Sequence, residues 1–163
     1  MTPAPFDQYF SEVPERLLPL FDDAKTLWEP LDRLPEFVKA NVRVGNRGTM
    51  KGNILIEGDV EIGEGTVIEH GAVIYGPTII GKNCQVRAGA YVRGNVVTGD
   101  DCVIGHATEV KDSILLVGVR ADHFSYIGYS ILGNAVHLAA GAKTASLRFD
   151  GKPIVINGFE TRR

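Results

Sequence analysis

A few side chains in the middle of this sequence have the chemistry of a site that binds an anion and moves a proton. Tyr75, Arg93 and Lys111 follow one another at intervals of 18, and Arg87 lies six positions before Arg93. His123 lies further along the chain. Cations can hold a phosphate while a neutral imidazole takes a proton as a general base. The alternative is that the Arg and Lys side chains only decorate a solvated surface.

A six-residue repeat must position these side chains. From Ile56 to Val110 an aliphatic residue, or once a threonine, returns at every sixth position, and the fourth residue after each is small or β-branched. A period of six fits neither an α-helix nor a half-buried strand, but it is typical of a parallel β-helix. Three hexads form a triangular coil of about 18 residues. The sequence therefore predicts an all-β fold in which Tyr75, Arg93 and Lys111 stack on one face.

The same period predicts how the corners of the coils are filled. Glycine follows the residue that starts equivalent sides, at Gly45, Gly63, Gly81 and Gly99. This suits a bend where a side chain would crowd or where φ turns positive. Cys84 and Cys102, also 18 apart, are expected to be buried corner fillers, because parallel side chains have poor geometry for a disulfide.

The repeat changes phase after Val110. Ile114 comes four positions later instead of six, and Leu132, Leu138 and Thr144 resume the interval of six in a new phase. A strict repeat needs no such break, so a loop or a site is expected there. His123 lies in this break.

Residues 1–41 have a different pattern, with apolar residues in short helical clusters separated by prolines at positions 14, 19, 30 and 35. We predict a short α-helical N-terminal cap over residues 1–41 and a hexapeptide-repeat β-helix over residues 42–163. The cap should cover the open end of the β-helix, with Trp28 as its plug. A second interpretation is that these helices dock a partner or make a trimer contact.

The whole chain has 163 residues and a formal net charge of −3, which fits one globular domain. It lacks a basic stripe with interleaved aromatic residues, so nucleic acid is not the expected partner. The first ten residues lack the pattern of a signal peptide, and no apolar run approaches the ~18 residues that span a bilayer. We expect a soluble, cytoplasmic protein with no membrane partner.

Three segments, residues 104–111, 121–128 and 132–141, resemble the acetyltransferase half of bifunctional N-acetylglucosamine-1-phosphate uridyltransferase/glucosamine-1-phosphate acetyltransferase. Residues 144–151 resemble the archaeal-type sugar-1-phosphate nucleotidylyltransferases, which share this domain of the hexapeptide-repeat acyltransferase superfamily. The resemblance spans roughly residues 44 to 160. It implies a left-handed β-helix, a homotrimer with active sites between subunits, and transfer of acetyl from acetyl-CoA to an amino-sugar-1-phosphate. This reaction belongs to UDP-N-acetylglucosamine biosynthesis and uses no metal at the catalytic site.

The resemblance also assigns roles to residues that bind or activate the sugar phosphate. His123 matches the general base that deprotonates the sugar amine, and Arg87 and Lys111 match the phosphate-binding cations. Tyr126 matches a tyrosine that touches sugar or phosphate, and His137 stands where the acetyltransferases have a sugar-binding Asn. One extra hexad separates Arg87 from Lys111 compared with the bacterial enzymes, which moves Arg87 by one side of the prism.

On the acetyl-CoA side, Ala140 matches a position whose backbone N–H holds the thioester carbonyl. Ser146 and Leu147 stand where the acetyltransferases have Asn-Tyr, so Ser146 is the second expected cofactor contact. The chain ends at Arg163, where the relatives continue for several coils that form much of the CoA channel.

Three function classes follow. The first is the acetyltransferase, with glucosamine-1-phosphate, galactosamine-1-phosphate or another amino sugar as acceptor. The second is a non-catalytic trimerising β-helix that works with a separate sugar-1-phosphate nucleotidyltransferase. It is supported by the missing coils of the CoA channel and by Ser146-Leu147 in place of Asn-Tyr. The third is a γ-type carbonic anhydrase, for which His70 and His106 have the spacing of two zinc ligands. Its third ligand would be Lys111, which is not a normal zinc ligand.

Overall fold

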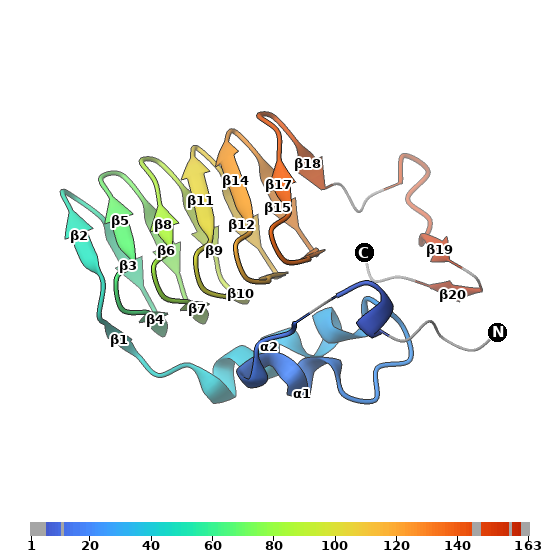
Figure 1. The fold of residues 1–163 in the computed structure, drawn as a ribbon. Coiled ribbons are helices and arrows are strands. Elements are labelled where there is room, and N and C mark those ends of the chain that lie inside the picture. Colours follow the sequence, from blue (N-terminus) through green and yellow to red (C-terminus); the bar gives the residue numbers. More distant parts are fainter. Residues whose placement is uncertain (1–5, 11, 145–147, 157, 161–163) are drawn as a thin grey trace.

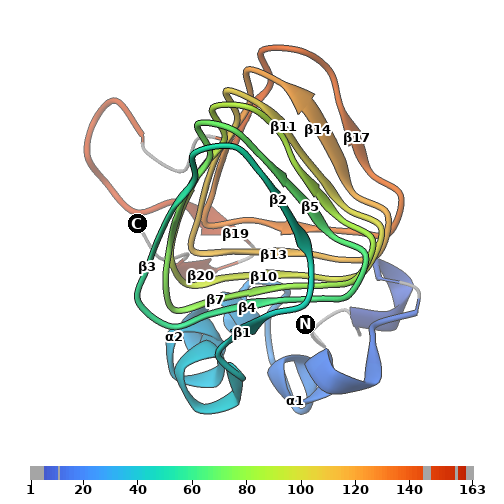
Figure 2. The same cartoon turned by 90° about the vertical axis from the view of Figure 1, so that its left-hand side faces the viewer.

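The structure is a computed structural model that describes residues 6–10, 12–144, 148–156 and 158–160. The chain winds as a left-handed β-helix whose three parallel sheets, of six strands each, form the sides of a triangular prism (Figures 1 and 2). Each sheet forms one side of the triangle, and each coil contributes one strand to every sheet. The predicted left-handed parallel β-helix is therefore confirmed.

The three sides are called sheets A, B and C, and their strands are given in spatial order. Sheet A contains β1 (Gly45–Asn46), β4 (Val60–Ile62), β7 (Thr78–Ile80), β10 (Val96–Thr98), β13 (Ser113–Leu115) and β16 (Ile131–Leu132). Sheet B contains β2 (Thr49–Lys51), β5 (Val67–Glu69), β8 (Gln85–Val86), β11 (Val103–His106), β14 (Arg120–His123) and β17 (His137–Leu138). Sheet C contains β3 (Leu55–Glu57), β6 (Val73–Tyr75), β9 (Tyr91–Arg93), β12 (Glu109–Lys111), β15 (Tyr126–Gly128) and β18 (Lys143–Thr144). Beyond the prism, β19 (Val155–Ile156) and β20 (Phe159–Glu160) form an antiparallel pair.

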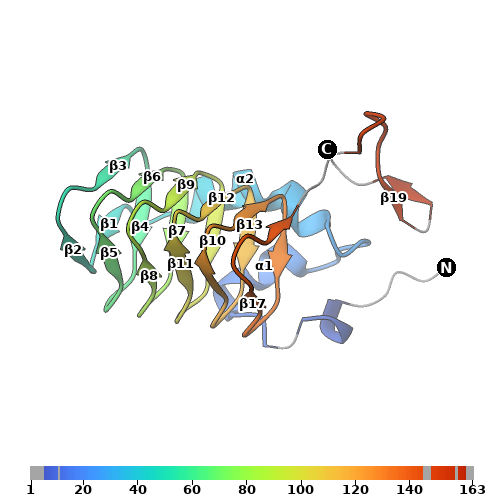
Figure 3. The ribbon, with the colours of Figure 1, turned by 90° about the horizontal axis from the view of Figure 1, so that it is seen from above.

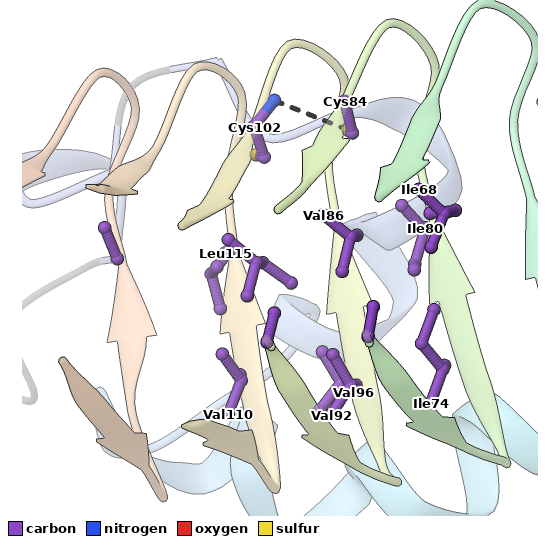
Figure 4. Close-up of a cluster of buried hydrophobic side chains, with 14 of the residues drawn as sticks. Ile68, Ile74, Ile80, Cys84, Val86, Val92, Val96, Cys102, Val110 and Leu115 are labelled. Atoms are coloured by element: carbon purple, nitrogen blue, oxygen red, sulfur yellow. Dashed lines mark hydrogen bonds between the residues drawn. The ribbon is translucent and has the colours of Figure 1, made fainter. Parts of the chain in front are cut away.

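The repeating aliphatic residues point into the prism and form its core (Figure 4). Ile68, Ile74 and Val86 are fully buried there. Burying a side chain of this size contributes about 1.5–3 kcal/mol. Ile56 in the first coil remains 38% exposed, because the prism is open at that end.

The two cysteines are buried in neighbouring coils and are not bonded to each other. The backbone N–H of Cys102 donates to Cys84 Sγ at 3.4 Å (Figure 4). The prediction of two buried corner fillers is confirmed.

The change of phase is a shortening of the coils by one residue. Val92 pairs with Val110, 18 positions on, but Thr98 pairs with Leu115 rather than with residue 116. Leu115 therefore points inward and Ile114 outward. No loop interrupts this described part of the chain. The coil is shorter by one residue because the corner between sheets C and A has one residue fewer.

The recurring corner glycine is explained by crowding rather than by backbone angle. Gly63 and Gly81 are not among the residues with positive φ. A Cβ on Gly63 would collide with the carbonyl oxygen of Gly81, and a Cβ on Gly81 with that of Gly99. The sequence predicted that Gly45 belongs to the same column as Gly63. This was wrong, because Gly45 pairs with Glu61 and Asn46 pairs with Ile62.

The helical segment lies along the outer face of sheet A and does not cover the open end (Figures 2 and 3). It consists of η1 (Phe6–Gln8), η2 (Glu15–Leu17), α1 (Leu18–Phe21) and α2 (Glu29–Asn41). The reason is that sheet A carries an outward apolar column, Ile79, Val97 and Ile114, which packs with Leu34 and Val38 of α2. The predicted position at the open end was therefore wrong.

The predicted plug, Trp28, lies elsewhere as well. It is half-buried and lines a shallow apolar hollow with Phe10, Leu31 and Tyr129. The expected helix break at Pro35 was wrong too, since Pro35 lies inside α2. Packing of α2 against sheet A outweighs the lost backbone hydrogen bond. None of the helices in the described ranges is long and apolar enough to cross a membrane.

A buried ion pair attaches the helical segment to the prism. Glu61 points outward from β4, and its side chain is only 6% exposed. Arg16 of η2 donates to both carboxylate oxygens, at 2.7 and 2.8 Å, and the Arg43 N–H donates to Oε2 at 2.8 Å. Burial would raise the pKa of Glu61, but the hydrogen bonds from Arg16 and Arg43 outweigh it and hold the pKa below its usual value.

Replacing Arg16 should therefore destabilise the protein. Breaking a buried ion pair costs about 3–5 kcal/mol, and because Arg16 is partly exposed we expect about 2–3 kcal/mol for Arg16→Ala in urea unfolding. The matched control is Arg47→Ala, because Arg47 lies 3.9 Å from the same carboxylate and is 63% exposed. It should change the free energy of unfolding by less than about 0.5 kcal/mol. Equal effects of the two substitutions would contradict the prediction.

Candidate active site

The edge where sheets B and C meet carries the predicted general base. His123 is the last residue of β14 and is exposed. It pairs with His106 of the preceding coil, and the Gly141 N–H of the following coil donates to its carbonyl oxygen at 3.2 Å. Ala140, which is also exposed, continues this column. The structure therefore places His123 and Ala140 in the same column on neighbouring coils.

His106 and Phe124 form the rest of this edge. The Nδ1 atom of His106 lies 2.7 Å from the carbonyl oxygen of Ala88, so in the neutral ring Nδ1 carries the proton. Its ring packs edge-on against Phe124, with centroids 5.1 Å apart. Phe124 has φ of 50° and is 59% exposed, whereas glycine fills the equivalent corner at Gly89 and Gly141. The equivalent corners at Ala107 and in the other coils also have positive φ, so Phe124 differs from them in its large exposed ring and not in its backbone.

Tyr126 lies on sheet C just past this edge. It is the first residue of β15 and is half-buried. Its hydroxyl oxygen lies 2.6 Å from where a Cβ on Gly128 would be, so the ring occupies space that only a glycine leaves open. The Tyr126 ring therefore extends from the His123 edge toward Gly128, which pairs with Lys111.

Lys111 lies at the other edge of sheet C, at the end of β12. Its Nζ atom is 4.5 Å from the centre of the Tyr129 ring, 3.4 Å from the Tyr129 hydroxyl and 3.9 Å from a carboxylate oxygen of Asp112. A cation over an aromatic face is held by the electrostatic field of the ring. Tyr129 therefore orients Lys111, a role that sequence reasoning missed.

The predicted column on sheet C is confirmed. Tyr75 pairs with Arg93, and Val92 pairs with Val110, so Arg93 lies directly below Lys111. Arg93 donates to Glu109 at 2.7 Å, and its side chain is 42% exposed. Two cations thus follow one another on this face.

Arg87 does not belong to this column. It follows β8 on sheet B, and its Nη1 atom lies 2.8 Å from Oδ1 of Asp122. The structure therefore brings Lys111 together with Arg93 rather than with Arg87. The extra hexad noted in the sequence is the cause, because six residues carry the chain from one sheet to the next.

Asp122 organises a group of cations on sheet B and was missed by sequence reasoning. It is 7% exposed. Arg120 donates to both of its oxygens, at 2.8 and 3.2 Å, and Nε2 of His137 lies 3.0 Å from Oδ2. Burial would raise the pKa of Asp122, but the hydrogen bond from Arg120 and the charges of Arg120, Arg87 and His137 outweigh it and lower the pKa. The signal that could have found this group is the register, since Arg120 pairs with His137.

Ser146, the second expected contact for acetyl-CoA, lies outside the described residues. Among the residues that are described, no group of three His, Cys, Asp or Glu side chains is arranged to hold a metal ion.

A triangular prism of hexapeptide coils, with an exposed histidine at one edge and stacked cations on the adjoining side, defines a hexapeptide-repeat β-helix protein related to acyltransferases. The sequence profile of the family described as the GMPPB C-terminal domain matches residues 74–158, more than half of the chain. The chain belongs to this family.

Several curated relatives are similar over a shorter stretch. "Bifunctional protein GlmU" of Methanococcus aeolicus is 41% identical over 54 residues, which is 33% of this chain and 13% of the relative. The protein of the same name from Methanocaldococcus jannaschii has the same identity and coverage. "Bifunctional sugar-1-phosphate nucleotidylyltransferase/acetyltransferase" of Sulfurisphaera tokodaii is 41% identical over 54 residues, 33% of this chain and 14% of the relative. The chain is thus related to transferases but matches about an eighth of their length.

The lowered pKa of Asp122 predicts how stability depends on pH. Its contribution is fully present above the unfolded pKa of about 3.9 and is lost as the pH falls through the lower folded value. The difference in unfolding free energy between the wild type and Asp122→Asn should therefore shrink between pH 6 and pH 3 in urea unfolding.

Asp150→Asn is the matched control for this measurement. Asp150 also pairs with an arginine, Arg148 at 2.8 Å, but both side chains are more than 40% exposed, so solvent screens the pair. The difference in unfolding free energy between the wild type and Asp150→Asn should stay small at both pH 6 and pH 3. A difference for Asp122→Asn that grows at pH 3 would refute the assigned sign.

Proposed function

We propose that this chain is an acetyl-CoA-dependent N-acetyltransferase acting on an amino-sugar-1-phosphate, of the glucosamine-1-phosphate type, in nucleotide-sugar synthesis. The observation that carries the proposal is the position of His123. It is exposed at an edge, with Ala140 in its own column and Tyr126 on the adjoining sheet. The acetyltransferase activity in the name of the relative from Sulfurisphaera tokodaii supports the same class of chemistry.

The proposed reaction is a direct transfer. The neutral imidazole of His123 takes a proton from the amine as its nitrogen attacks the thioester carbonyl, and the new C–N bond replaces the C–S bond. The proton then passes to the departing CoA thiolate. The Ala140 N–H donates to the thioester oxygen, where negative charge develops, and a fixed backbone dipole needs no reorganisation for this.

The cations on sheet C hold the phosphate in this proposal. Lys111 is already oriented by Tyr129, and Arg93 lies below it in the same column. Tyr126 lies between these cations and His123 and contacts the sugar. We further propose a cytoplasmic homotrimer in which a neighbouring subunit completes the site. Its mass in sedimentation equilibrium tests the trimer.

The first test measures CoA release from acetyl-CoA with glucosamine-1-phosphate. Loss of a general base costs about 10²–10⁴-fold in turnover, so His123→Ala should reduce kcat by that factor. The matched control is His70→Ala, since His70 is also exposed at this edge but lies in an earlier coil. Equal activity of the wild type and His123→Ala would exclude His123 as the base.

The second test separates binding from catalysis at Lys111. A hydrogen bond to a charged group contributes about 1.5–3 kcal/mol, so Lys111→Gln should raise KM for the sugar phosphate about tenfold or more. Its kcat should change far less, because Lys111 contacts the phosphate and not the reacting amine. Lys51→Gln, an exposed lysine on β2, is the control. A fall in kcat at unchanged KM would contradict this role for Lys111.

A second candidate function is a non-catalytic, trimerising β-helix associated with a separate sugar-1-phosphate nucleotidyltransferase. The description of the matched family as a C-terminal domain favours it, because such a domain accompanies another one. Absence of turnover in a folded trimer, together with co-elution with such an enzyme, would support it over the acetyltransferase.

A further inference from the structure

A second group of cations lies on sheet B, away from the column of Arg93 and Lys111 on sheet C. Arg87, Arg120 and His137 all reach the carboxylate of Asp122, at 2.8, 2.8 and 3.0 Å. These residues come from three coils, and the coil of β11 lies between that of Arg87 and that of Arg120. The prism thus gathers them at one place on its surface.

The group carries more positive than negative charge. Both guanidinium groups are charged at any physiological pH, so the single carboxylate neutralises only one of them. Protonation of His137 would add another charge. Glu69 lies below Arg87 in the register, but its Oε2 accepts a hydrogen bond from the Ala88 N–H at 3.0 Å. That hydrogen bond leaves the negative charge of Glu69 in place, but Lys51 is the next residue below Glu69 in the register. With Lys51 counted, three positive charges face two negative ones, so one net positive charge remains for an incoming anion.

The cations are also held in place and accessible. The Asp122 side chain is only 10% exposed, whereas those of Arg120 and His137 are 45% and 62% exposed. Arg87 is held a second time, because its Nε donates to Gln85 Oε1 at 3.0 Å. A guanidinium whose fork is already oriented loses little freedom on binding and still has N–H donors that match a phosphoryl group.

Gly105 makes this arrangement possible. It lies between Arg87 and Asp122 in the register, and a Cβ there would collide with the backbone of Asp122. The Arg87 side chain crosses this position to reach Asp122. A larger residue at 105 would separate the two groups.

We propose that Arg87, Arg120 and His137, held together by Asp122, form a second anion site that binds a phosphoryl group separately from Lys111. The source of that group rests on the proposed function: it is either the amino-sugar-1-phosphate or the phosphates of acetyl-CoA. Binding of the phosphoryl group itself needs no turnover.

The test follows the histidine ring signals by NMR during titration with inorganic phosphate, with the His137 signals assigned from His137→Gln. Phosphate should shift the His137 signals, and Arg120→Gln should weaken the measured affinity about tenfold. Arg148→Gln is the matched control, because Arg148 also pairs with an aspartate and is 48% exposed. Its affinity should equal that of the wild type. Unshifted His137 signals, or equal affinities for the two arginine variants, would overturn the proposal.

Lys111→Gln tests whether the two sites are separate. The phosphate-induced shift of His137 should persist in this variant, and its loss would mean a single site and overturn the proposal. Repeating the titration with acetyl-CoA and with glucosamine-1-phosphate identifies the source of the phosphoryl group. Arg120→Gln should weaken the affinity only for the ligand whose phosphoryl group binds at the second anion site. If Arg120→Gln weakens ligand binding but the wild type releases no CoA, the acetyltransferase proposal fails and the second anion site stands. If the wild type releases CoA but Arg120→Gln binds every ligand as tightly as the wild type, the second anion site fails and the acetyltransferase proposal stands.

Discussion

The pairing of each coil with the next is the interaction on which the rest of this structure depends. The N–H groups of Val67, Gln85 and Val103 donate to carbonyl oxygens of the following coil at 2.8–2.9 Å. A slip of one residue would turn every side chain of a strand to the opposite face. The filled interior prevents such a slip, because it would bury charged residues and expose aliphatic ones. The packing of the core therefore also fixes which side chains point outward and stack at the candidate site.

The helical segment adds a second constraint by occupying one of the three sides. Because α2 packs on sheet A, and Arg16 pairs with the buried Glu61, that side is covered. The candidate residues that the structure describes lie on sheets B and C or at the edges of these sheets. The N-terminal helices thus leave free the two sides that meet at His123.

The sequence allowed the prism, its inward rows and the column of Tyr75, Arg93 and Lys111 to be predicted, because one period fixes which residues point inward and which stack. It also placed Arg87 one side of the prism away from this column, because six residues carry the chain from one sheet to the next. The position of the helices was missed although a signal exists. Ile79 and Ile114 each precede an inward residue, and two consecutive apolar residues in a strand mean that both faces are covered. The contacts of Asp122 were missed, because they depend on the register of the coils after they shorten.

That shortening decides what the candidate site contains. In an uninterrupted 18-residue repeat, the column of Arg87 would continue through Gly105 to position 123. With one residue fewer, His106 pairs with His123, so Asp122 takes the place above Gly105 instead. The carboxylate then meets Arg87, and the imidazole moves to the edge, where it is exposed. A one-residue change at the distant corner between sheets C and A thus assembles the cation group on sheet B and turns His123 toward the solvent at the same time.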